Sequence, residues 1–238
     1  IHVPFKLADY AQCDFDFEGY PKPNFLNLVN NGLDAYGQTL AIDHTYRLKN
    51  LYVMNNNGSR NLALQDGRSR AKWVAPLDGN CFFTLAAWQA VQSTLQTHHY
   101  WKYITVPLVR IEQNEDLLDP TFQPRTTTEP QIIFRCDARE RFDETVRYGN
   151  WSKVELLKRL RIPGVWDEWD YQPWERRRLP ESPESGQYAE AGWVARLASG
   201  VPEVENHEDQ RRDSRHQGVW FLLDRLDEQV ARRTFQTD

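Results

Sequence analysis

The 238-residue sequence contains little cysteine and no long hydrophobic run. Its three cysteines, Cys13, Cys81 and Cys136, are too few and too irregularly spaced for a disulfide scaffold or a cysteine-based zinc site. No stretch of about 18 apolar residues is present, which a membrane-spanning helix would need. The sequence therefore predicts neither a disulfide-rich scaffold nor a membrane span within this chain.

Several enzyme motifs are also absent. The sequence contains no Gly-x-Gly-x-x-Gly, no Walker phosphate loop, no Gly-x-Ser-x-Gly and no His-Glu-x-x-His. Each of these patterns places a glycine, a nucleophile or a metal ligand where one particular chemistry needs it. Their absence disfavours a dinucleotide-binding enzyme, a nucleophilic-serine hydrolase and a zinc protease.

Positive charge is in short supply. The chain has 29 Lys and Arg residues against 34 Asp and Glu, which gives a formal net charge of −5. A protein that binds nucleic acid through its phosphates depends on an excess of positive charge. We therefore expect no nucleic-acid partner.

Aromatic residues, by contrast, are abundant. They make up 13% of the chain and include nine tryptophans, which would be costly to leave in water. The length suffices for one sizeable core or two small ones. The mean hydropathy of −0.73 predicts a modest core with long polar surface segments.

The spacing of apolar residues predicts strands that alternate with helices. Thr84 is a candidate N-cap, and Pro107 indicates an edge or a bulge in its strand. Lys153, Lys158, Arg159 and Arg161 are expected mostly on the solvent face of their helix. We expect helices over 25–36, 60–64, 85–95, 151–161 and 218–233, a turn at 55–59, and strands over 39–54, 71–77, 103–111 and 131–135.

This alternation predicts an α/β fold in which helices flank a sheet of mixed direction. From about residue 165 the composition changes to Trp, Pro, Glu and Arg, which is typical of loops. We therefore expect an α/β domain over 1–164, and a loop-rich aromatic arm with a terminal helix over 165–238 that packs on it.

The strand expected over 71–77 ends at Asp78-Gly79-Asn80. Residues two apart on an extended chain point to the same side, so a carboxylate and an amide oxygen would meet at the strand end. Such oxygens can hold Mg²⁺ or Mn²⁺ together with a substrate diphosphate. Taken alone, the same tripeptide also fits a turn that caps the following helix.

Two blocks of sequence strengthen the first interpretation. The segment Arg60–Gly67, followed by the strand and Asp78–Asn80, resembles the nucleotide-sugar-binding core of GT-A glycosyltransferases, in which a similar helix precedes the metal-binding strand end. Downstream, Arg141–Gly149 and Glu155–Leu160 resemble the second half of the same fold. Together the blocks cover roughly residues 55–164.

The resemblance implies a GT-A-like fold over 1–164 and a divalent metal, Mn²⁺ or Mg²⁺. It implies that Asp78 and Asn80 contact the metal and the donor diphosphate, with Asn80 in place of the usual second acidic residue, and that Arg60 and Asn61 lie beside the nucleotide-sugar. The segment 1–10 is a poor version of the apolar strand that opens such folds. We therefore expect an N-terminally truncated piece of a longer polypeptide, which also explains the start at Ile1.

In many members of this family an acidic pair after an aromatic-Gly step supplies the general base. Here Tyr148-Gly149 is followed by no carboxylate until Glu155. The base must reach the acceptor hydroxyl. We therefore expect Asp143 or Glu144 in this role, with Glu155 as a further alternative.

The aromatic segment 166–174 is the candidate acceptor site. Aromatic rings stack on the C–H faces of sugars, while carboxylates accept hydrogen bonds from sugar hydroxyls. An alternative is that the tryptophans pin a long loop onto the core, and another is a glycosidase pair drawn from Asp167, Glu168 and Asp170. The expected acceptor-binding residues are Trp166, Asp167, Trp169 and Trp174.

The sequence thus predicts metal-dependent transfer of a sugar from a nucleotide-sugar donor to a carbohydrate hydroxyl. In this hypothesis the metal offsets the charge that develops on the leaving diphosphate. The alternative is a non-catalytic carbohydrate-binding or scaffolding domain of a larger polysaccharide-handling protein. The missing acidic pair and the aromatic segment motivate that alternative.

Overall fold

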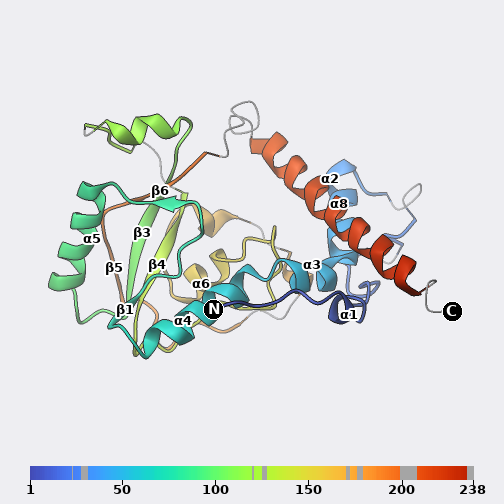
Figure 1. Cartoon of the computed structure of the whole chain (residues 1–238), viewed down its shortest axis with the longest axis horizontal. Helices are drawn as coiled ribbons and strands as arrows, with labels where there is room; N and C mark the ends of the chain where they lie inside the picture. The colour runs from blue at the N-terminus through green and yellow to red at the C-terminus, as the bar shows by residue number, and fades with distance from the viewer. Residues whose placement is uncertain are drawn as a thin grey trace.

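A mixed β-sheet with helices on both faces forms one part of the molecule, and a group of helices lies beside it (Figure 1). The computed structural model describes residues 1–22, 24–27, 32–119, 121–124, 128–169, 172–175, 179–198 and 208–234. The α/β class with a mixed sheet, expected from the sequence, is confirmed. Within these ranges, no helix combines the length and the apolar composition needed to cross a bilayer.

In the described part of the chain the sheet has six strands, and β3 is paired on both sides. Strand β3 is antiparallel to β4, which continues to β1, and parallel to β5 and β6. Strand β2 pairs with β6 at the other edge. Since β5 and β6 follow residue 165, the sheet draws on both parts of the chain. The strands are β1 (Trp73–Val74), β2 (Cys81–Phe82), β3 (Tyr103–Arg110), β4 (Thr128–Arg135), β5 (Tyr188–Glu190) and β6 (Val194–Arg196).

Side chains of β4 alternate between two cores, as the two-residue period of a strand requires. Phe134 packs with Leu64 of α4 (Asn56–Arg68) and Leu157 of α6 (Val154–Arg159) on one face. Ile133 packs with Val91 of α5 (Leu85–Thr97) on the other. The sheet part is therefore three layers thick, with α4 and α6 on the face that leads to the helical group.

The helical group consists of α1 (Leu7–Tyr10), α2 (Ala35–Thr45), α3 (Arg47–Val53) and the long α8 (Glu208–Thr234). Tyr10, Leu223 and Leu226 form a core between α1 and α8. The Tyr10 hydroxyl also donates to Asp227 Oδ1 at 2.9 Å. Short 3-10 helices complete the described chain, namely η1 (Asn114–Leu118), η2 (Val165–Glu168) and η3 (Pro173–Glu175).

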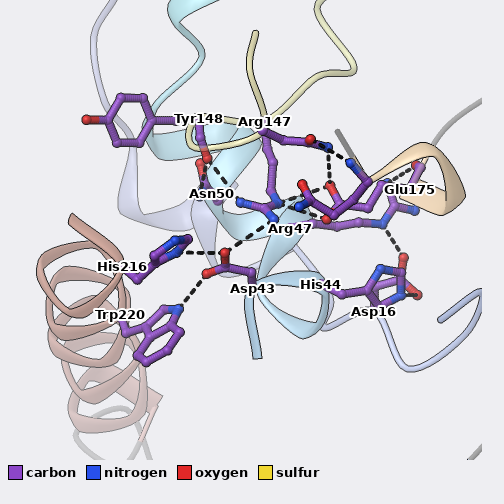
Figure 2. A network of polar contacts seen from close by, with 12 residues as sticks. Asp16, Asp43, His44, Arg47, Asn50, Arg147, Tyr148, Glu175, His216 and Trp220 are labelled. Carbon is purple, nitrogen blue, oxygen red and sulfur yellow. Dashed lines mark hydrogen bonds and ion pairs between the residues drawn. The ribbon is translucent and has the colours of Figure 1, made fainter. Parts of the chain in front are cut away.

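A buried ion-pair network holds α8, α2, η3 and the segment before α6 together (Figure 2). Arg147 Nε donates to both carboxylate oxygens of Glu175, each at 3.0 Å, and Arg147 Nη2 lies 3.3 Å from Asp43 Oδ2. Asp43 accepts a hydrogen bond from Trp220 Nε1 at 2.8 Å and lies 2.7 Å from His216 Nδ1. The network therefore ties α8 to residues distant in sequence.

Several local predictions in the first 60 residues are wrong. Residues 39–54 form α2 and α3 rather than strands, and 24–27 form a turn where a helix was expected. The expected turn at 55–59 is the start of α4, because Asn55 Oδ1 accepts from Gly58 N at 2.7 Å and caps the helix. Helix α2 begins similarly, since the side chain of Asp34 accepts from Gly37 N.

The predictions for the centre of the sheet are confirmed. Thr84 caps α5, β3 and β4 lie where expected, and the register between β3 and β4 shifts around Pro107. The strand expected over 71–77 is shorter, because β1 ends at Val74, and it lies at an edge of the sheet. Asp78 therefore belongs to the turn between β1 and β2 rather than to the tip of a strand.

Gly67 allows α4 to lie directly against β1. A Cβ at this position would meet Val74 Cγ1 at 2.6 Å and Cγ2 at 2.9 Å. We expect Gly67→Ala to lower the free energy of unfolding by about 1–3 kcal/mol, because the helix and strand must move apart. Gly218→Ala is the control, since Gly218 lies inside α8 with no atom near its Cβ position, and it should stabilise by about 0.5–1 kcal/mol. Urea unfolding measures both, and equal effects of the two changes would contradict this account.

Candidate functional site

A cavity of about 750 Å³ lies where the sheet part, α2, α4 and α8 meet. Its size falls within the range of small-molecule sites. Turn 76–80 and the first residues of β4 form one side, and the segment 148–154 forms another. The lining includes Tyr36, Arg60, Asp78, Asn80, Arg110, Glu129, Tyr148, Trp151, Ser152, Lys153, Trp169, Arg196, Arg215 and His216.

The cavity lining is positively charged although the chain is negative overall. Two carboxylates line it in the described part of the chain, Asp78 and Glu129, and Arg and Lys side chains outnumber them. Such an excess of charge favours an anionic ligand, and arginine and lysine bind phosphate through charge-assisted hydrogen bonds. The cationic lining residues are Arg60, Arg110, Lys153, Arg196 and Arg215.

Helix α4 contributes Arg60 to the cavity and holds a neighbouring segment of the chain in place. Asn57, Arg60 and Asn61 lie three and four residues apart, so they share one helix face, and all three are buried. Asn57 Nδ2 donates to the carbonyl oxygens of Asp143 and Ser152, each at 2.8 Å, while its Oδ1 accepts from Arg60 Nη1. This face therefore fixes the segment 143–152, whose residues from Tyr148 onward form the opposite wall.

Asp78 is surrounded by donors. Its Oδ1 accepts from Arg60 Nη2 at 2.6 Å and Nε at 3.2 Å, and its Oδ2 accepts from Gln131 Nε2 at 3.2 Å. Lys153 Nζ lies 3.8 Å from Oδ2. Burial would raise the pKa of Asp78, but the positive charges of Lys153 and Arg60 outweigh it and hold that pKa below its usual 3.8. Asp78 is therefore an ionised carboxylate.

Lys153 is a buried cation that faces the cavity. Its side chain is 7% exposed, whereas the sequence pattern had placed it on the solvent face of a helix. Helix α6 begins one residue later, at Val154, so Lys153 does not follow the periodicity of that helix. Burial lowers the pKa of the Lys153 ammonium below its usual 10.5, and the charges of Glu129 and Asp78 offset only part of that shift.

Two tryptophan rings form an aromatic wall of the cavity. Trp151 and Trp169 have ring centroids 4.3 Å apart and an interplanar angle of 35°. The backbone of Trp151 has a φ of 49°, which turns the chain sharply before Lys153. Tyr36 and Tyr148 also line the cavity. Aromatic faces beside cationic and polar groups suit a ligand that carries both sugar rings and phosphates.

The residues expected to bind the donor separate into two groups. Arg60, Asp78 and Asn80 line the cavity, and the first two are in direct contact. Asn61 lies outside the lining, because its Nδ2 donates to Phe142 O and to Glu144 Oε1, each at 2.8 Å. Asn61 therefore holds the neighbouring loop in place.

The residues expected to act as the base lie outside the cavity lining. Asp143 Oδ1 accepts from the backbone and the hydroxyl of Thr145, and Glu144 bonds to Asn61. Glu155, the further alternative, is buried and pairs with Arg159. The carboxylate that sequence reasoning missed is Glu129, which precedes Pro130 at the start of β4 and shows no local pattern.

The residues expected to bind the acceptor also separate. Trp169 faces the cavity, but Trp166 packs in the core and donates from Nε1 to Ile162 O at 2.9 Å. Asp167 Oδ2 accepts from Gly164 N, and the ring of Trp174 packs edge-on against Tyr20. Glu168 is outside the cavity lining, and Asp170 lies outside the described residues.

The contacts of Asp78 favour cationic side chains of the protein over a metal ion. Both of its oxygens already accept hydrogen bonds from Arg60 and Gln131, and a divalent ion there would be repelled by Arg60 and Lys153. Within the described ranges, no cluster of three or more His, Cys, Asp or Glu side chains is arranged to hold a metal. As arranged here, Asp78 and Asn80 do not fit a Mg²⁺ or Mn²⁺ site.

Comparison of the chain with protein-family models, with curated proteins and with solved structures gave no match. The chemistry of the cavity is therefore the basis for a functional interpretation.

Proposed function

We propose that this chain transfers a sugar from a nucleotide-sugar donor to the hydroxyl of a carbohydrate acceptor. The observation that carries the proposal is a single cavity with an excess of Arg and Lys on its walls and a pair of tryptophan rings beside them. The first feature suits a diphosphate and the second suits sugar rings. The sequence resemblance to GT-A glycosyltransferases over residues 55–164 supports the same proposal.

In this proposal the donor diphosphate lies beside turn 76–80, within reach of Lys153 and of the arginines that line the cavity. The acceptor sugar stacks against Trp169 and Trp151. Two negative phosphates gain more from a preorganised cationic wall than from water, because the protein groups need not reorient as charge develops on the leaving group. The arrangement therefore stabilises the departing nucleoside diphosphate.

Glu129 is the base in this proposal. Asp78 is held by Arg60 and Gln131, which leaves Glu129 as the other carboxylate among the described lining residues. The acceptor oxygen forms a bond to the anomeric carbon as the bond from that carbon to the diphosphate oxygen breaks. The electron pair of the broken bond remains on the diphosphate, and the proton of the acceptor hydroxyl passes to Glu129.

The metal stays a separate prediction. Binding of Mn²⁺ or Mg²⁺ by Asp78 and Asn80 would supply positive charge to the leaving diphosphate. That prediction requires the Asp78→Ala variant to lose Mn²⁺-dependent binding of a nucleoside diphosphate, as measured by titration calorimetry. No step of the proposed reaction depends on it.

The proposal predicts that a nucleoside diphosphate raises the melting temperature of the protein. A ligand that binds only the folded state stabilises it by about 2.7 kcal/mol at a hundred times its Kd. The measurement is thermal unfolding with UDP, GDP, CDP and ADP, each with and without MnCl₂, and the free nucleosides serve as controls without phosphate. If none of the diphosphates changes the melting temperature in either condition, the proposal is wrong.

A non-catalytic carbohydrate-binding domain is the second candidate. The positions of Asp143, Glu144 and Glu155 outside the cavity favour it, because the expected base is not where an acceptor would lie. Calorimetry with oligosaccharides separates the two candidates. Binding of glycan alone, indifferent to nucleotide, supports the carbohydrate-binding domain.

A further inference from the structure

We infer that Lys153 binds the donor diphosphate directly, and that Asp78 is a positioning residue for this lysine rather than a metal ligand. Nucleotide binding then needs no divalent ion. This inference rests on the proposed function, because it assigns the group that holds the diphosphate in the same cavity. It replaces the metal expected from the sequence with a cation of the chain itself.

Lys153 has N–H donors that no acidic side chain in the described part of the chain accepts. An ammonium carries three N–H donors, and burying it costs free energy unless it is paired. Its nearest acidic oxygen in the described part of the chain, Asp78 Oδ2, is 3.8 Å away, which is beyond hydrogen-bond distance. The side chain is only 7% exposed, yet it lines the cavity. A bound anion would supply the acceptors that the protein does not.

The donors of Arg60 are already occupied by other side chains of the protein. Its guanidinium donates to Asp78 Oδ1 from Nε and Nη2 and to Asn57 Oδ1 from Nη1, and it lies over the ring of Phe142 at 5.4 Å. These contacts fix Arg60 and Asp78 as one rigid unit. Lys153, held by the charges of Asp78 and Glu129 at more than hydrogen-bond distance from Asp78, is the more available of the two cations for a ligand.

The charged side chains around Lys153 also favour an anionic ligand over a metal ion. Two carboxylates, Asp78 and Glu129, act on Lys153 beside Arg60, and the positive excess of the cavity comes from Arg110, Arg196 and Arg215 on its walls. A diphosphate brings negative charge and is attracted, whereas a divalent cation brings more positive charge to the same place. Asp78 limits the repulsion between Arg60 and Lys153 and keeps Lys153 at the cavity wall.

The test is isothermal titration calorimetry with UDP, GDP and inorganic pyrophosphate, in EDTA and in MnCl₂. We expect at least one probe to bind in EDTA, and Lys153→Met to weaken that binding about ten- to a hundredfold, the effect of one hydrogen bond to a charged group. Lys102→Met is the matched control. It also removes a lysine paired with an aspartate, Asp137, but outside the cavity lining, and it should leave affinity unchanged.

A second pair of variants distinguishes a positioning role for Asp78 from metal ligation. If Asp78 positions Lys153, Asp78→Asn weakens binding to the same extent in EDTA and in MnCl₂, because the lysine loses a charge that holds it at the cavity wall. If it holds a metal, the loss appears in MnCl₂ alone. Lys153→Arg keeps a cation at the site and should retain more affinity than Lys153→Met, even if the methionine variant folds poorly.

The pH dependence is a further readout that a purely structural role would not move. The charged and titratable groups facing Lys153 are Asp78, Glu129, Arg60 and Cys81. Affinity should fall as the pH rises through the lowered pKa of the Lys153 ammonium, since only the charged form attracts the anion. Loss of the Asp78 charge lowers that pKa further, so the fall should begin at lower pH in Asp78→Asn.

The outcomes separate this inference from the proposed function. Binding that appears only with MnCl₂ and is lost in Asp78→Asn overturns the inference and leaves the transferase proposal standing. Binding in EDTA that a folded Lys153→Met variant does not weaken also overturns the inference. Absence of binding by every probe in both conditions overturns the proposed function itself.

Discussion

Replacement of Arg147 by methionine is expected to lower the free energy of unfolding by about 3–5 kcal/mol, the usual cost of removing one partner from a buried ion pair. The side chains of Arg147, Asp43 and Glu175 are 2%, 2% and 3% exposed. The change would leave Glu175 without its arginine partner and Asp43 with one cation fewer (Figure 2). A buried carboxylate cannot regain the hydration that it lost on folding.

Guanidinium unfolding followed by circular dichroism measures this loss. The matched control is Arg225→Met, which removes an arginine from a pair with Glu228 on the exposed face of α8. That change should cost less than about 1 kcal/mol, because solvent screens the exposed pair. A loss of under 1 kcal/mol in Arg147→Met would show that the network is not a stabilising element of the fold.

The same experiment has a consequence for the cavity. His216 lines the cavity and Trp220 does not, yet both are held by Asp43, the partner of Arg147. A loosened α8 would therefore alter the cavity wall that Arg215 and His216 form. Weaker diphosphate binding in Arg147→Met, with a melting transition still cooperative, is the expected secondary effect.

The sequence predicted the elements of the sheet best, because their patterns are local. The alternation of Ile104, Val106 and Leu108 and the cap at Thr84 carry their structural meaning within a few residues. The prediction of strands over residues 39–54 was wrong because their structure depends on distant contacts. Their β-branched and aromatic residues favour strands, but α3 packs against α8, which lies more than 150 positions later in the chain. Tertiary packing outweighs propensity there.

At the candidate site, proximity in sequence explains which of the expected residues come together. Arg60 and Asp78 meet because α4 and the turn after β1 are consecutive elements. Lys153 was placed on the wrong face, since a helical period counted from residue 151 ignores the actual start of α6 at Val154. Glu129 comes to the cavity only through the pairing of β4 with β3, which no local pattern records.

Glu129→Gln is expected to lower kcat by about a hundred- to ten-thousandfold if sugar transfer proceeds as proposed, the usual contribution of a general base. The amide is close in size to the carboxylate but cannot accept the proton of the acceptor hydroxyl. Donor binding should be unchanged or tighter, because a negative charge near Lys153 is removed. The loss should therefore appear in kcat and not as a higher KM for the nucleotide-sugar.

Steady-state rates with the donor found by thermal unfolding provide the measurement, and Glu112→Gln, an exposed glutamate after β3, is the control that should keep the wild-type rate. Glu144→Gln tests the base expected from the sequence. A loss of kcat there, with Glu129→Gln fully active, would return the role to the loop at 143–144 and require that loop to move toward the acceptor. If both variants keep the wild-type rate, neither carboxylate is the base, because a base that takes the proton in the transition state cannot be removed without cost.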